Sequence, residues 1–481
     1  MKKKLTFVFD YIFPTFILPN ALDIQMGIIN YISSVHTNRT LNSTIFEPPA
    51  NNKGNQIFMQ DMFGNSMGHN PNTAHGYFFQ ASIYREHLDY SESSVLFERY
   101  SQKKFIYPIR PNPIFSQFTG VGNGFADKLN GSYFWKFISR EVIEKVKDDK
   151  GIIYIDFTME PYIDLDMHKG LIECLKNSGI PKTNIFVVVN SFNAKELYES
   201  WFNENERKYQ VRNLPFCLDH SSWFYNDGIK NNLRLSMNLD NFYETKNIIR
   251  PNKYLMKIRN NRSHRLAALY RLINDDLLKY GDWSFLSTNG VDEASIKNIM
   301  NRYNLFEVSY DKIIKAHELF PHKLQSENDI NYANVNAWTD LHFKPHLDSY
   351  FEVCFETLSE GEHKSLTEKI FKPIINFQPF IFVTFAGGLK LLKSLGFKTF
   401  EGFIDESYDD IESVENRMLA IHNEVKRLCN MSNEELHNWY WSMEDILVHN
   451  HKLLLEYHKT KPYGVDFINE LYDIQNHIIR R

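Results

Sequence analysis

Several features that define common classes of protein are missing from this chain of 481 residues. No run reaches the roughly 18 uncharged apolar residues of a membrane span, so no such span is predicted. Basic residues are not in excess either, because the formal net charge is -5. A chain without a positive field has no general attraction for nucleic acid, and any contact with a polyanion requires a local patch.

Cysteine is scarce and the familiar catalytic motifs are absent. The four cysteines are far apart and form no CxxC pair: Cys174, Cys217, Cys354 and Cys429. This spacing predicts reduced thiols in a cytoplasmic protein and no zinc site. The sequence also contains no GxxxxGK[ST], no GxGxxG after a strand, no GxSxG and no HExxH. The P-loop, dinucleotide-binding, α/β-hydrolase and zinc-protease signatures are therefore excluded.

Apolar residues make up 43% of the chain and aromatic residues 15%, which is ample for packed cores. The length favours two domains and a helical extension. The start, MKKKLTFVFDYIFPTFILPN, imitates a signal peptide, but Asp10 and Pro14 interrupt its apolar region. We therefore expect a first core strand at Lys4 to Phe9.

Strand and helix patterns alternate along most of the chain. Strands are predicted at residues 151–157, 184–190, 254–258, 282–286, 350–355 and 380–385, and helices at 133–147, 168–178, 194–202, 265–278 and 296–303. Residues 31–131 have weak periodicity, and residues 409–479 are largely helical in pattern. The alternation predicts parallel sheets, in an N-terminal α/β domain at 1–245, a C-terminal one at 246–415 and a helical tail at 416–481.

The first chemical constellation is the basic segment NKYLMKIRNNRSHR, where a strand meets a helix. It carries Lys257, Arg259, Arg262, His264 and Arg265. Helix amino termini favour anions, and arginines beside them bind phosphate oxygens in pairs, so this corner is predicted to hold a diphosphate. Ser263 is expected to cap the helix. The alternative is a solvated basic turn, or salt bridges between domains.

The second constellation follows the apolar run at 350–355. Glu356 ends that strand, and Thr367, Glu368, Lys369 and Lys372 precede or enter the next helix. Both acids and the lysines are then expected at the carboxyl edge of a parallel sheet, where open α/β sheets bind ligands. A carboxylate there can accept hydrogen bonds from a ribose diol; Glu368 is otherwise an acid favoured by the helix dipole.

A third set of acids follows the early strands. Asp156, Glu160 and Asp164 lie at or beyond the strand 151–157, and Asp10 ends the first strand. An acid at such a place acts as a general base toward a hydroxyl. Glu160 is preferred and Asp10 is its rival, with solvated loop acids as the alternative. The pair Asp164 and Asp166 has the spacing of a metal site but no convincing strand end, and no metal is predicted.

The segment SLTEKIFKPIINFQPFIFVTFAGGLKLLKSLGFKTFEGFIDESYDD resembles the C-terminal signature of phage and bacterial glycosyltransferase-like proteins, and its TEK corner is similar to that of fucosyltransferases. The upstream YLMKIRNNRSHRLAALYRL is similar to the arginine-rich donor-phosphate corner of that group. The resemblance covers residues 150–415. It implies two facing Rossmann-like domains of the GT-B type, with a nucleotide-sugar in the C-terminal domain and the acceptor in the N-terminal one. By matched position, Arg259, Arg262 and Arg265 would face the diphosphate, Glu356 and Glu368 the ribose or sugar hydroxyls, and Lys369 the phosphates.

The function that the sequence and this resemblance predict is a metal-independent glycosyltransferase without a cofactor, acting in the cytoplasm (the host cytoplasm if the source is viral). Its donor is a nucleotide-sugar and its acceptor a glycan, a protein side chain or a modified DNA base. The alternative is a non-catalytic structural or binding protein that retains the fold.

Overall fold

The computed structural model describes residues 5–9, 88–92, 104–109, 140–157, 165–176, 178–213, 236–287, 291–324, 343–460, 472–474 and 476. The chain divides into two compact units. The first comprises Met1–Ser222, His363–Ser365 and Pro462–Arg481, and the second comprises Trp223–Glu362 and Leu366–Lys461. Each contains a parallel sheet with helices, so the predicted mixed α/β class is confirmed at that level.

The first unit is built on six described strands: β1 (Leu5–Phe9), β2 (Leu88–Glu92), β3 (Phe105–Ile109), β4 (Gly151–Phe157), β5 (Ile185–Val189) and β6 (Gln210–Asn213). They pair in parallel in the order β2-β1-β3-β4-β5-β6. Three described helices accompany them: α9 (Arg140–Lys147), α10 (Leu165–Lys176) and α11 (Ala194–Trp201). Strand β5 reads IFVVV and is buried throughout, as expected for an inner strand of a covered parallel sheet.

The second unit has four described strands: β7 (Asn252–Ile258), β8 (Gly281–Phe285), β9 (Ser349–Phe355) and β10 (Phe380–Val383). All pair in parallel, in the order β10-β9-β7-β8. The aromatic ring of Tyr254 on β7 fills the space where a side chain at Gly281 would stand, since an added Cβ would lie 2.3 Å from that ring. This close approach explains why β8 begins with glycine.

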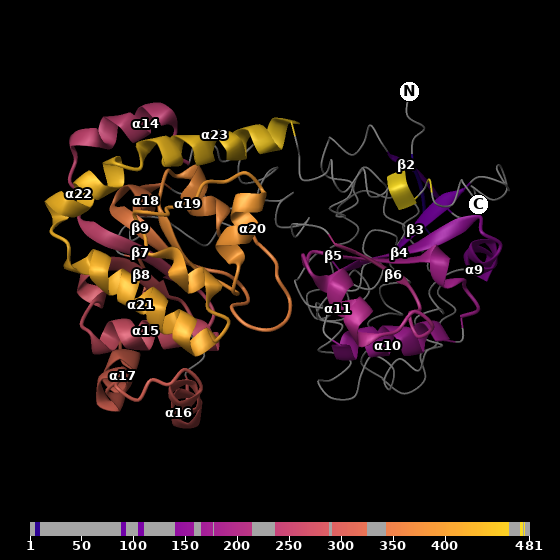
Figure 1. The fold of residues 1–481 in the computed structure, drawn as a ribbon, viewed down its shortest axis with the longest axis horizontal. Coiled ribbons are helices and arrows are strands. Elements are labelled where there is room, and N and C mark those ends of the chain that lie inside the picture. Colours follow the sequence, from indigo (N-terminus) through magenta and orange to yellow (C-terminus); the bar gives the residue numbers. More distant parts are fainter. Residues whose placement is uncertain are drawn as a thin grey trace, which may run out of the picture. The chain divides into compact units, whose positions relative to one another are not determined.

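Helices cover both faces of the second sheet. The described ones are α14 (Leu239–Glu244), α15 (Ser263–Asn274), α16 (Glu293–Arg302), α17 (Tyr310–His317), α18 (Lys344–Leu347), α19 (Phe371–Ile375), α20 (Gly388–Ser394), α21 (Val414–Asn430), α22 (Asn433–Trp441) and α23 (Glu444–Thr460), with the 3-10 turn η10 (Glu406–Asp410). Figure 1 shows α15 and α21 on one side of the sheet and α19 and α23 on the other. The helices that the sequence assigned to a separate tail thus pack within this unit as far as Lys461.

Local signals in the sequence explain where many of these helices begin. Ser432 and Glu435 form a reciprocal capping box at the start of α22. The side chains of Asp292, Ser309 and Ser413 accept backbone N–H groups at the starts of α16, α17 and α21. Helix α20 is preceded by Gly387 at φ 86°, a left-handed conformation that glycine adopts without a steric cost.

Two details of the basic corner differ from the prediction. Helix α15 begins at Ser263, two residues earlier than expected, and its N-cap is Arg262 without a side-chain capping bond. Ser263 is the first helical residue and not the cap. Helix α19 begins only at Phe371, so Glu368 and Lys369 lie in the turn before it. The early start of α15 brings Arg262 to its amino terminus.

Candidate functional site

The strand order of the second sheet reverses between β7 and β9. Strand β7 is followed by β8 on one side, whereas β9 lies on its other side and is followed by β10 further out. In open parallel sheets the crevice for a ligand lies outside the carboxyl ends of the strands at such a reversal. The segments that leave these ends begin at Arg259 and Glu356, so the two constellations predicted from sequence meet at this point.

The basic residues of the corner contact the segment that follows β9. Arg262 Nη1 donates to the carbonyl oxygen of Thr357 at 3.1 Å, and Arg265 Nη2 donates to that of Glu356, also at 3.1 Å. His264 Nε2 lies 3.3 Å from the same Glu356 oxygen. Two guanidinium groups from the start of α15 therefore converge on the end of the neighbouring strand.

The positive charge at this corner is only partly compensated. Arg265 is 5% exposed, and its Nε has no hydrogen-bond partner among the described residues. Burial lowers the pKa of Arg265, the charge of Arg262 lowers it further, and Glu356 and Glu368 act in the opposite direction, which leaves it at about 10. An anion held here would relieve the repulsion between the two guanidinium groups.

His264 was predicted as a donor-binding residue, but its surroundings keep it neutral. Burial and then the charges of Arg265 and Arg262 lower its pKa to about 3. A neutral imidazole placed against a carbonyl oxygen donates from Nε2, and the His264 ring packs near Phe355. His264 thus braces the end of β9 and brings no positive charge to a phosphate.

The sequence predicts that Glu356 faces a ligand, but in the structure both of its carboxylate oxygens accept hydrogen bonds from the protein. Its Oε1 accepts from Thr367 N at 2.8 Å, and its Oε2 accepts from Thr357 N at 3.0 Å and from Thr367 Oγ1 at 2.6 Å. The residue is 1% exposed. Glu356 and Thr367 therefore form a clasp that joins the end of β9 to the turn before α19.

The turn before α19 brings Glu368 and Lys369 to the same corner. Lys369 Nζ lies 3.0 Å from Glu368 Oε1 and donates to the hydroxyls of Thr357 and Thr367, both at 3.1 Å. The side chain of Lys369 is 28% exposed and that of Glu368 only 6%. Since the carbonyl oxygen of Thr357 also accepts from Arg262, the structure brings Arg262, Lys369 and Glu368 together near Thr357.

Lys257 and Lys372 belong to an adjoining cluster that the sequence did not reveal. Lys257 Nζ lies 3.5 Å from Glu352 Oε1 and 3.2 Å from His346 Nε2. Burial raises the pKa of Glu352, while Lys257 and then Lys372 lower it. The missed signal was Glu352 itself, a charged residue inside the apolar run of β9, because a buried charge requires a partner nearby.

The remaining predicted residues are not gathered at this corner. Arg259 is exposed. The two candidates for the general base, Glu160 and Asp10, lie outside the described residues, as does Asp164. Asp166 is exposed, and its Oδ1 lies 3.8 Å from the Nζ of Lys169, one turn away on α10.

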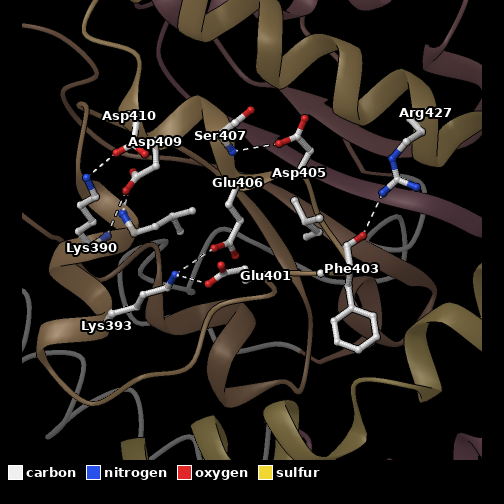
Figure 2. A pocket seen from close by; sticks show the side chains of 13 residues that line it. Lys390, Lys393, Glu401, Phe403, Asp405, Glu406, Ser407, Asp409, Asp410 and Arg427 are labelled. Atoms are coloured by element: carbon white, nitrogen blue, oxygen red, sulfur yellow. Dashed lines mark hydrogen bonds and ion pairs between the residues drawn. The ribbon is translucent and has the colours of Figure 1, made fainter.

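The structure also contains a cavity of about 620 Å³ that lies away from this corner. It is formed by α20, the 401–410 segment and Arg427 of α21. Figure 2 shows Lys393 pointing between Glu401 and Glu406. Its Nζ lies 3.1 Å from Glu401 Oε2 and 3.4 Å from Glu406 Oε2. Asp409 accepts backbone N–H groups from Leu389 and Lys390.

None of the predicted donor-binding residues lines this cavity, and its charges argue against an anionic ligand. Acids outnumber bases in the lining, where Glu401, Asp405, Glu406, Asp409 and Asp410 face Lys390, Lys393 and Arg427. Burial raises the pKa of Glu406 and of Asp409. A phosphate would meet a net negative surface here, so the switch-point corner is the better candidate despite the size of the cavity.

Three further observations limit the chemistry of the described part of the chain. No group of three or more His, Cys, Asp or Glu residues there is arranged to hold a metal ion. Cys354 and Cys429 are buried free thiols, and burial raises the pKa of both. None of the helices that the structure describes is both long and apolar enough to cross a bilayer.

Comparison with known proteins adds no family to these observations. No protein-family model matches the chain, and no match was found among curated proteins or among solved structures. A functional conclusion therefore depends on the geometry of the site.

Proposed function

We propose that the second unit binds a nucleoside diphosphate-sugar and that the chain is a glycosyltransferase. The observation that supports this is the pair Arg262 and Arg265, which converge at the start of α15 on the topological switch point and repel each other. Such a corner combines free helix N–H groups with planar guanidinium donors, which suits the two phosphates of a diphosphate.

In this proposal the corner acts on the leaving group. Negative charge grows on the diphosphate as the bond to the sugar breaks, and fixed cations that face it stabilise the transition state more than the ground state. Lys369 supplies a third positive charge, and Glu368 an acceptor for a donor hydroxyl. The arrangement of two facing domains and the roles of Glu160 or Asp10 as base toward the acceptor remain part of the proposal.

A non-catalytic protein that retains the fold is the second candidate. The observation that favours it is that Arg262 and Arg265 donate to backbone carbonyls, as arginines that only brace a loop do. If the two arginines only brace the loop, their loss should lower the stability of the protein. If they bind the nucleotide, their loss should lower the affinity for it.

Calorimetric titration of the full chain with UDP, GDP, ADP and CDP, and then with the matching nucleotide-sugars, separates these candidates. Arg262 is half-buried, and among the described residues its side chain donates to the Thr357 carbonyl oxygen, so we expect Arg262→Gln to keep the melting temperature and to weaken nucleotide binding. The loss of one charge-assisted contact costs about 1.5–3 kcal/mol, or roughly 10–100-fold in Kd.

Lys315→Gln, at an exposed position on α17, removes the same charge away from the corner and serves as the control. Failure of all four nucleotides and their sugars to bind at millimolar concentration would reject the enzymatic proposal. Equal binding by the Arg262→Gln variant would reject the site.

A further inference from the structure

Asn190 in the first unit occupies the kind of position where parallel sheets bind ligands. It directly follows β5, an inner strand whose last residue, Val189, pairs with Phe157 of β4 and Asn213 of β6. Asn190 therefore stands at the carboxyl edge of three neighbouring strands. This edge is the one at which open α/β sheets place their functional groups.

The side chain of Asn190 is buried, and neither of its polar atoms is used by the residues that the structure describes. The residue is 1% exposed, and neither Oδ1 nor Nδ2 has a hydrogen-bond partner among the described residues. Two other asparagines of the unit have partners: Asn184 Nδ2 donates to Val146 O at 2.9 Å, and Asn213 Nδ2 donates to Phe192 O at 2.8 Å. Burying an amide without hydrogen-bond partners costs free energy. The presence of such an amide therefore indicates that a ligand supplies the missing polar groups.

The residues that share this part of the sheet have complementary chemistry. Side chains alternate along a strand, so Asn190 continues the face of Val188 and Phe186. Val188 pairs with Asp156 of β4 and with Arg212 of β6, whose guanidinium lies 5.7 Å from the centre of the Phe186 ring. Asp156, Asn190 and Arg212 thus occupy neighbouring positions near one sheet edge.

An amide satisfies both of its polar atoms at once when it meets a donor and an acceptor side by side. Two neighbouring hydroxyls of a sugar provide this pair, and so does the edge of an adenine ring. The net charge of -5 gives the chain no general attraction for a phosphate backbone, which favours the sugar.

We propose that Asn190 binds neighbouring hydroxyls of a carbohydrate, so that the acceptor of the proposed glycosyltransferase is a glycan. This inference rests on the proposed function for the identity of the acceptor, but the sugar site itself lies in the first unit. Its test is therefore independent of nucleotide binding by the second unit.

The test uses the full chain with lactose, maltose, cellobiose and chitobiose as probes. Adenosine represents the alternative ligand, an adenine ring. Saturation-transfer NMR should detect at least one disaccharide, and Asn190→Leu should weaken that signal at least tenfold. Asn190→Asp keeps an acceptor but loses the donor, so a partial loss is expected. The same Asn→Leu change at exposed Asn205 should leave the signal unchanged.

A second readout is the melting temperature without ligand. Replacing an unsatisfied amide by an apolar group of similar shape is expected to raise the melting temperature by about 2–4 °C, because functional groups are often held at a cost in stability. An unfolded or destabilised Asn190→Leu variant would overturn the proposal, since it would mean that the amide is already satisfied within the fold.

The binding results decide the rest. Binding of adenosine alone, or of no disaccharide in an Asn190-dependent way, would also overturn the carbohydrate site. Titration of the Asn190→Leu variant with nucleotides tests the proposed function separately. The second unit of this variant should bind nucleotides with the affinity of the wild type, and an absence of nucleotide binding by both proteins would mean that the proposed function has failed as well.

Discussion

The clasp between Glu356 and Thr367 gives the sharpest prediction, because the sequence and the structure assign it different roles. In Glu356→Gln one carboxylate oxygen becomes an NH2 group. If the remaining oxygen stays on Thr367 N, the new NH2 faces the N–H of Thr357, which then has no acceptor. A charge-assisted hydrogen bond is worth about 1.5–3 kcal/mol, and a buried unsatisfied N–H costs about 1–3 kcal/mol more. We therefore expect a loss of about 3–5 kcal/mol in the free energy of unfolding of the second unit.

Guanidinium unfolding of the full chain measures this loss, and hydrogen exchange of peptides that cover residues 350–372 assigns it to the second unit. Thr367→Val removes the hydroxyl bond to Glu356 together with the acceptor that Lys369 Nζ contacts, and should cost about 1.5–3 kcal/mol, whereas Thr367→Ser keeps that hydroxyl and serves as the control. The double variant should show coupling, because both changes act on one carboxylate. A Glu356→Gln variant with unchanged stability and weakened nucleotide binding would refute the clasp and restore Glu356 as a ligand contact.

Three further predictions concern the second unit. Arg250 is 2% exposed, donates from Nη1 to His346 O and Ser349 O and lies over the Tyr440 ring, so Arg250→Met should cost about 3–5 kcal/mol in chemical denaturation. Recovery of full stability by Arg250→Lys would contradict a role for stacking of the planar guanidinium on Tyr440. Burial lowers the pKa of His451 to about 4, below the unfolded value, so its contribution to stability is present above pH 6.5 and is lost as the pH falls toward 4. His451→Gln should flatten the fall in urea midpoint over that range, and a parallel fall in both proteins would refute this. Gly281→Ala should lower stability by about 1–3 kcal/mol in the same assay because its Cβ would overlap the Tyr254 ring, and an unchanged midpoint would show that the ring moves freely.

The sequence predicted the inner strands of the two sheets closely. The segment 151–157 forms β4 with the predicted bounds, and β5 and β7 differ from prediction by one or two residues at their ends. These runs are apolar and bounded by polar or turn-forming residues, so local pattern alone specifies them. Short elements such as β6 and α17 were not predicted, because their patterns are weak and their stability comes from packing.

The sequence by itself also determined which residue types surround the predicted anion corner, since Arg262, Arg265, Glu356, Glu368 and Lys369 each stand next to the end of a strand or the start of a helix. Only the tertiary structure decided what each one does. The sheet order, set by pairing between distant strands, makes β7 and β9 neighbours at a reversal of topology. Backbone N–H groups then surround Glu356, burial neutralises His264, and Asn190 is buried without a hydrogen-bond partner in the part of the chain that the structure describes. Burial and hydrogen bonding depend on neighbours that are distant in sequence.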